Sequence, residues 1–203
     1  MATILGRWFG NLYEMRPARR AVAVWLLFQA VLWLAFGSGY LTSPEAWVDV
    51  PVVSTSEAAV GGWLSTFLFI IANNALVLAV IIVGNLFARF AWLTPGLLVL
   101  LIQGAAIGWL AGTNGFEVPF ASVAAANAQF LRVGLWETTA YAIACAMTLP
   151  KSLFISRSFP AKEWAEVHKL RDLRFSGIEI LLGLLVIVAL LAAALVEANY
   201  LAN

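Results

Sequence analysis

The feature that most constrains this chain is a series of five apolar segments, each long enough to cross a lipid bilayer as an α-helix. A spanning helix needs about 20 mostly apolar residues. The predicted spans cover residues 21–41, 64–88, 93–112, 129–149 and 178–198. The sequence is 63% hydrophobic and 11% charged, whereas a soluble domain carries about 25% charged residues. We therefore predict an all-α fold over residues 1–203, a single integral membrane bundle of about five transmembrane helices.

The basic residues predict how this bundle is oriented. With a cytoplasmic N-terminus, Arg132 is the one basic residue of the 12 Lys and Arg that lies outside. Cytoplasmic loops carry an excess of Lys and Arg. The segment between the first two spans has Glu45, Asp49 and Glu57 and no basic residue. The expected orientation is N-in and C-out.

Two segments outside the spans have amphipathic patterns. Residues 1–20 are too polar for a signal peptide, and their apolar residues fall in pairs such as Trp8/Phe9 and Leu12/Tyr13. This spacing predicts an N-terminal interfacial helix in the headgroup region. A helix docked against other protein is an equal alternative.

The other segment, residues 150–177, is predicted to be a cytoplasmic amphipathic loop. Its second half is predicted to be an amphipathic helix, because Trp164, Val167, Leu170 and Leu173/Arg174 lie at helical spacing. It is a candidate docking surface for a soluble partner or, equally, for anionic lipid headgroups. The residues expected to dock are Trp164, His168, Lys169, Arg171 and Arg174.

Four polar side chains fall near the middle of the predicted spans. Asn73 and Asn74 lie roughly 14–15 Å along the second span, at 1.5 Å per residue. Gln103 in the third span and Glu137 in the fourth lie at similar depth. We expect these four side chains to form a polar intramembrane seam between the three helices, because polar groups in a bilayer bond across helix contacts.

Small residues at helical spacing mark the expected close contacts between helices. Gly104, Gly108 and Gly112 are four residues apart in the third span. Gly84 and Gly134 accompany the polar residues of the second and fourth spans. The second, third and fourth spans are therefore predicted to form the core.

Glu137 is the most informative of the polar residues, because an ionised carboxylate within a bilayer is costly. Three interpretations stay open: a protonated carboxyl that donates to an Asn carbonyl, an ion pair with Arg132, or a site that handles an ion, a proton or a partner.

The sequence lacks the usual residues of enzyme active sites. His168 is the only histidine and lies outside the spans, and Cys145 is the only cysteine. Neither a His-Glu-x-x-His motif nor a phosphate-binding glycine loop occurs. We predict no enzymatic activity, no cofactor and no metal, and a net charge of +1 gives no reason to expect nucleic acid.

Three stretches resemble the stage II sporulation protein M family of small membrane proteins: "FLFIIANNALVLAVIIVGNLFARF", "GLLVLLIQGAAIGWLAG" and "FLRVGLWETTAYAIACAMTL". Asn74 and Gly84 match the family's Asn and the Gly that follows it. Gln103, Gly104 and Gly108 match its hairpin motif, with Gln in place of Asn. Gly134 and Glu137 match its Gly-x-x-Glu, but Val133 stands where the family usually has His.

The resemblance implies a non-enzymatic component that works with other membrane or membrane-associated subunits, in a prokaryotic cytoplasmic (inner) membrane. Our first hypothesis is accordingly an integral scaffold or accessory subunit of a larger membrane complex, surrounded by the lipid bilayer. The alternative is a permease or channel-like module with a polar site around Glu137.

Overall fold

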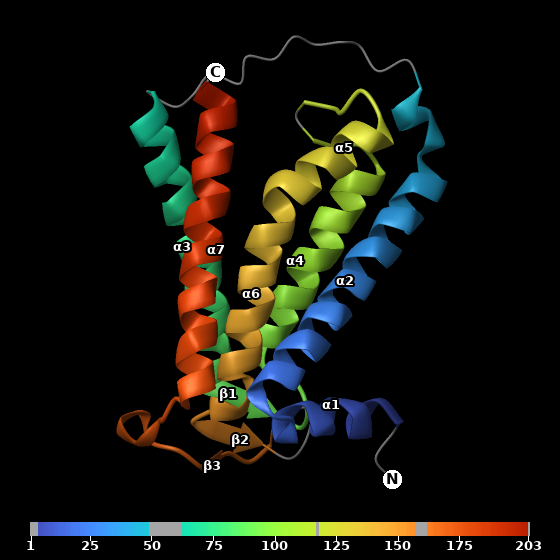
Figure 1. Ribbon diagram of the computed structural model, residues 1–203. Coiled ribbons are helices and arrows are strands. Elements are labelled where there is room, and N and C mark those ends of the chain that lie inside the picture. The colour runs from blue at the N-terminus through green and yellow to red at the C-terminus, as the bar shows by residue number, and fades with distance from the viewer. Residues whose placement is uncertain (1–3, 49–61, 117, 157–161, 203) are drawn as a thin grey trace.

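The computed structural model of the chain describes residues 4–48, 62–116, 118–156 and 162–202, and it is mostly helical (Figure 1). Four helices are long and apolar enough to cross a membrane: α2 (Pro17–Thr42), α3 (Trp63–Phe87), α4 (Pro95–Gly112) and α7 (Gly177–Ala202). The chain is therefore a helical-bundle, multi-pass membrane protein.

The helix that the sequence predicts over 129–149 is divided into three consecutive segments. These are α5 (Val123–Gln129), a π-helical turn η2 (Phe130–Gly134) and α6 (Leu135–Thr148). The chain stays helical from 123 to 148, but it bends at the π-turn (Figure 1). A side chain at Gly134 would meet the Phe130 ring, since an added Cβ would lie 2.8 Å from it.

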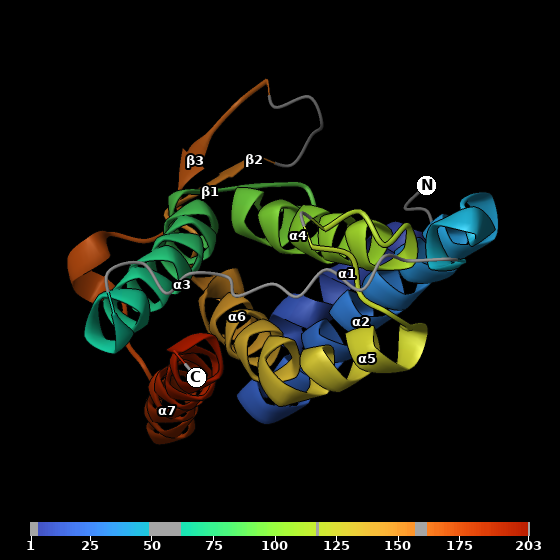
Figure 2. The same cartoon turned by 90° about the horizontal axis from the view of Figure 1, so that it is seen from above.

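Helix α6 lies in the middle of the bundle, between α2, α3 and α7 (Figure 2). Every residue from Ala140 to Ala146 is buried, as expected of a helix with neighbours on all sides. The sequence placed the core among the second, third and fourth spans, but α2 and α7 also pack directly on α6.

Gly104, Gly108 and Gly112 of α4 face α2, and not the polar side chains of α3 and α6. A Cβ at Gly108 would collide with the Leu32 carbonyl oxygen, and one at Gly112 with that of Phe36. Helices α2 and α4 can approach this closely because these positions carry no side chain. Gly84 of α3 makes the equivalent close contact with Gly96 at the start of α4.

Helix α1 (Ile4–Glu14) lies across one end of the bundle (Figure 1). It is docked against protein: Leu12 is fully buried, and the Phe9 ring stacks on Trp92 at 4.6 Å. The Tyr13 hydroxyl donates to the Trp92 carbonyl at 3.0 Å. Of the two alternatives from the sequence, the structure thus shows the docked helix.

A small sheet lies at the same end, with strand order β1-β2-β3. Strand β1 (Ala88–Phe90) runs parallel to β2 (Phe154–Ser156), which pairs antiparallel with β3 (Ala165–Glu166). The described residues also include three short 3-10 helices: η1 (Pro44–Trp47), η3 (Leu149–Lys151) and η4 (Leu170–Asp172).

The amphipathic helix predicted within 150–177 is wrong. In the described part of this segment, Trp164, Val167 and Leu170 are all exposed, and the backbone pairs with strands instead. The Val167 N–H donates to the Leu153 carbonyl at 2.9 Å. Helical spacing of apolar residues is a local signal, and strand pairing with residues 153–155 overrides it.

Candidate functional site

The middle of the bundle holds a polar cluster between α3 and α6, here called the Asn74 cluster (Asn74, Glu137 and Tyr141). The Asn74 amide nitrogen donates a short hydrogen bond to the Glu137 carboxylate. The Tyr141 hydroxyl donates to the Asn74 carbonyl oxygen at 2.8 Å. Asn74 therefore uses both ends of its carboxamide to link two residues one turn apart on α6.

A second carboxylate approaches this cluster from α7. Glu197 and Glu137 both act electrostatically on the Tyr141 hydroxyl. Tyr141 is 3% exposed, whereas Glu137 and Glu197 are half-buried. The candidate site thus has one acid, one amide and one phenol from α3 and α6, and the Glu197 carboxylate of α7 adds to the electrostatic field at Tyr141. The sequence reasoning missed Glu197, although an acid in the last apolar span carries the same signal that identified Glu137.

A second polar cluster lies on the same face of α3, here called the Asn85 cluster (Asn85, Thr94, Cys145, Thr148 and Ser152). Asn85 follows Asn74 by eleven residues, about three helical turns, and is fully buried. Its amide nitrogen donates to the Cys145 carbonyl at 3.1 Å and to the Thr148 hydroxyl at 2.9 Å. Its oxygen accepts from the Thr94 hydroxyl at 2.6 Å.

The Asn85 cluster also organises the local backbone. The Thr94 hydroxyl caps α4 by accepting from the Leu97 N–H at 3.2 Å. The Ser152 hydroxyl donates to the Asn85 carbonyl at 2.8 Å. The end of α3, the start of α4 and the end of α6 are joined by one neutral network.

Asn73 and Gln103 do not join the predicted seam. Asn73 is exposed on the outer side of α3, and Gln103 is half-buried on α4. Neither side chain makes a hydrogen bond to any part of the chain that the structure describes. Successive residues of a helix point about 100° apart, so Asn73 cannot share the face of Asn74. Equal depth in the membrane does not imply equal rotation toward a neighbour.

Arg132 does not pair with Glu137 either. The Arg132 guanidinium lies over the Tyr200 ring of α7, 5.0 Å from its centroid. The Glu137 carboxylate is an acceptor for Asn74, so the interpretation in which it donates to an Asn carbonyl does not describe this geometry.

A buried charge network at the α1 end was also missed. Glu179, 5% exposed, lies 3.5 Å from Arg20 and 3.2 Å from Lys151. The Arg20 guanidinium also donates to the Ala146 carbonyl at 2.6 Å. Ser176 and Glu179 cap α7 reciprocally, with Ser176 N–H donating to the carboxylate at 2.8 Å. This Ser-x-x-Glu spacing is a capping box, a signal that the sequence contains.

The five residues predicted to dock a partner or lipid are all exposed: Trp164, His168, Lys169, Arg171 and Arg174. His168 and Lys169 line a surface pocket of about 440 Å³ with Glu166, Val167 and Asp172. Across the described ranges, no three His, Cys, Asp or Glu side chains gather closely enough to hold a metal ion.

Comparison with known proteins does not assign the chain to a family. No family model, curated protein or solved structure matches it. The resemblance to the stage II sporulation protein M family therefore stays a prediction that rests on the quoted motifs, and the interpretation of the two clusters rests on their geometry.

Proposed function

We propose that the protein is a non-enzymatic integral membrane subunit, a scaffold or accessory component that binds a transmembrane helix of an unlike subunit along α3. The observation that carries this proposal is the exposed carboxamide of Asn73, in the middle of an apolar helix, which has no hydrogen-bond partner among the described residues. The family resemblance also implies a component that works with other proteins.

The exposed side of α3 has the pattern of a helix–helix contact. Phe69, Asn73, Leu76, Val80, Val83 and Phe87 are all exposed and follow alternating spacings of four and three residues. Lipid can cover the apolar members of this row, but it cannot satisfy the carboxamide of Asn73. A single polar residue in such a row selects a partner and its register. The occupant that fits is a transmembrane helix with a polar group at the same depth.

We further propose five membrane crossings, with the N-terminus inside a prokaryotic cytoplasmic membrane. The helical stretch 123–148 supports the fifth crossing, since 26 residues extend about 39 Å at 1.5 Å each. The basic residues Arg20, Arg89 and Lys151 all lie at the α1 end of the bundle, as the positive-inside rule requires of a cytoplasmic face.

Asn73 and Asn74 form a matched pair for testing the proposal. Asn73→Leu should keep the fold and its stability in detergent, and should abolish recovery of an unlike subunit. Asn74→Leu should lower stability without changing the exposed row. A photocrosslinker at Leu76, which is 64% exposed, should yield one discrete adduct with that subunit, whereas one at Leu184 on α7 should not. A Leu76 adduct of twice the chain mass would identify a second copy instead and overturn the proposal.

A permease or channel-like module is the second candidate, and the Asn74 cluster with Glu197 favours it. Two half-buried carboxylates beside one phenol are a plausible route for a proton or cation. Under this candidate, Glu137→Gln abolishes a flux in proteoliposomes while the fold is retained. Under the subunit proposal no flux exists, and the same variant changes only stability or assembly.

A further inference from the structure

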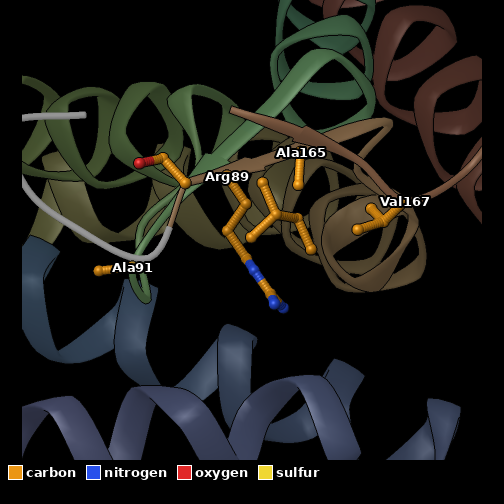
Figure 3. Close-up of a pocket in the computed structure, with 6 residues that line it drawn as sticks. Arg89, Ala91, Ala165 and Val167 are labelled. Atoms are coloured by element: carbon orange, nitrogen blue, oxygen red, sulfur yellow. The ribbon is translucent and has the colours of Figure 1, made fainter. Parts of the chain in front are cut away.

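The α1 end of the bundle contains a pocket that neither cluster uses. It has a volume of about 350 Å³ and is lined by Arg89, Ala91, Ile155, Ser156, Ala165 and Val167. These residues come from the sheet and its flanking turns. Figure 3 shows Arg89 extending from β1 away from the strands, toward the N-terminal helices.

Arg89 is held in position but not neutralised. Its guanidinium lies over the Tyr13 ring, 4.2 Å from the ring centroid. The Tyr13 hydroxyl is itself fixed by its hydrogen bond to the Trp92 carbonyl. Burial raises the pKa of Tyr13 above its ordinary value, so the phenol is neutral and supplies no negative charge. None of the ion pairs between described residues includes Arg89.

One donor of Arg89 is left over. Its Nε–H is buried and has no hydrogen-bond partner among the described residues. An unsatisfied donor on a charged group is more costly than one on a neutral group. The two terminal nitrogens of a guanidinium, which are not buried in Arg89, can form a fork that matches two oxygens of one phosphate or carboxylate.

We propose that this pocket binds a phosphate-bearing anion, with Arg89 as the bidentate donor. Among the residues that the structure describes, no carboxylate lines the pocket, since Ala165 and Val167 at the β3 edge line it and Glu166 lines the neighbouring pocket. The site follows α3 directly, at the level where a helix leaves the hydrocarbon layer. A phospholipid headgroup is therefore one source of the phosphate, and free phosphate is the other.

Native mass spectrometry of the full chain in neutral detergent tests this site with phosphatidylglycerol, phosphatidylcholine and inorganic phosphate as probes. The proposal expects Arg89→Gln to weaken binding of the preferred probe about tenfold. Arg171→Gln removes a charge whose side chain is 79% exposed, and it should change binding less than about twofold. Ala165→Phe fills the pocket while keeping Arg89 on Tyr13, so it should weaken binding as Arg89→Gln does.

The outcomes of these measurements distinguish a phospholipid headgroup from free phosphate as the source of the anion. Tight phosphatidylglycerol binding that millimolar phosphate does not displace supports a headgroup site. Saturable binding of inorganic phosphate that competes with the lipid supports a free-phosphate site. Equal losses in Arg89→Gln and Arg171→Gln, or no loss in Ala165→Phe, would show ordinary surface attraction and overturn the proposal.

Discussion

Each of the two polar clusters is centred on an asparagine on the same face of α3, but the clusters differ in whether all their polar groups have neutral partners. Asn85 is fully buried, and all its partners are neutral. Asn74 is bonded to a half-buried carboxylate that a second carboxylate approaches from α7. The Asn85 cluster satisfies every polar group it contains, which suits a purely structural role. The Asn74 cluster keeps an ionisable group within the membrane, which suits function.

The change expected to have the largest effect is Asn85→Leu. It removes four side-chain hydrogen bonds and takes one partner from each of the buried hydroxyls of Thr94 and Thr148. We expect a loss of about 2–3 kcal/mol in the free energy of unfolding, measured by titration with denaturing detergent in mixed micelles. A loss no greater than that of Asn74→Leu would remove the proposed distinction between the clusters.

Asn74→Leu is expected to have an intermediate effect, about 1–1.5 kcal/mol in the same titration. It removes two hydrogen bonds, but the half-buried Glu137 can recover solvation or a proton. The adjacent Asn73→Leu is the control, and it should change the unfolding free energy by less than about 0.5 kcal/mol. Equal destabilisation by the two changes would contradict the rotation of α3 described above.

Thr148→Val should cost about 1 kcal/mol. The hydroxyl both accepts from Asn85 and donates to the Ala144 carbonyl at 2.8 Å. A double-mutant cycle with Asn85→Leu measures how much of this loss belongs to the pair. Strict additivity of the two changes would show that the Asn85 cluster is not a single network.

Tyr141→Phe should have the smallest effect, about 0.6 kcal/mol, the average for one hydrogen bond between membrane helices. It removes only the bond to the Asn74 carbonyl and leaves the ring in place. The losses of unfolding free energy in Tyr141→Phe and Thr148→Val, measured in parallel titrations, show which cluster contributes more to stability. A larger loss for Tyr141→Phe would place the more structural role at the Asn74 cluster.

The candidate site was only partly predictable from the sequence. Glu137 and Asn74 stand out because polar residues in long apolar segments are few and costly. Asn85 follows Asn74, and Thr148 follows Glu137, by eleven residues, about three helical turns, and the structure joins Asn85 to Thr148. Thr94 could not be linked to Asn85 in this way, because that bond depends on how the turn after β1 folds back.

The segment after α6, at the α1 end of the bundle, was also only partly predictable from the sequence. Trp164, Val167 and Leu170 have helical spacing, but β3 pairs with β2, and β2 pairs with β1, which follows a different helix. A strand partner distant in the sequence leaves no periodic signal in the segment itself. The pocket around Arg89 exists only because this pairing brings β1 and β3 together.

The sequence by itself determined that the chain is a helical membrane protein, where its long helices lie and which polar residues they carry. These properties follow from local hydrophobicity and helix length, because a spanning helix must be apolar and long enough to match the hydrocarbon layer. Only the tertiary structure decided which neighbour each side chain meets. Asn73 and Asn74 are the same residue at nearly the same depth, yet a rotation of about 100° buries Asn74 against its partners on α6 and leaves Asn73 exposed on the surface of the bundle.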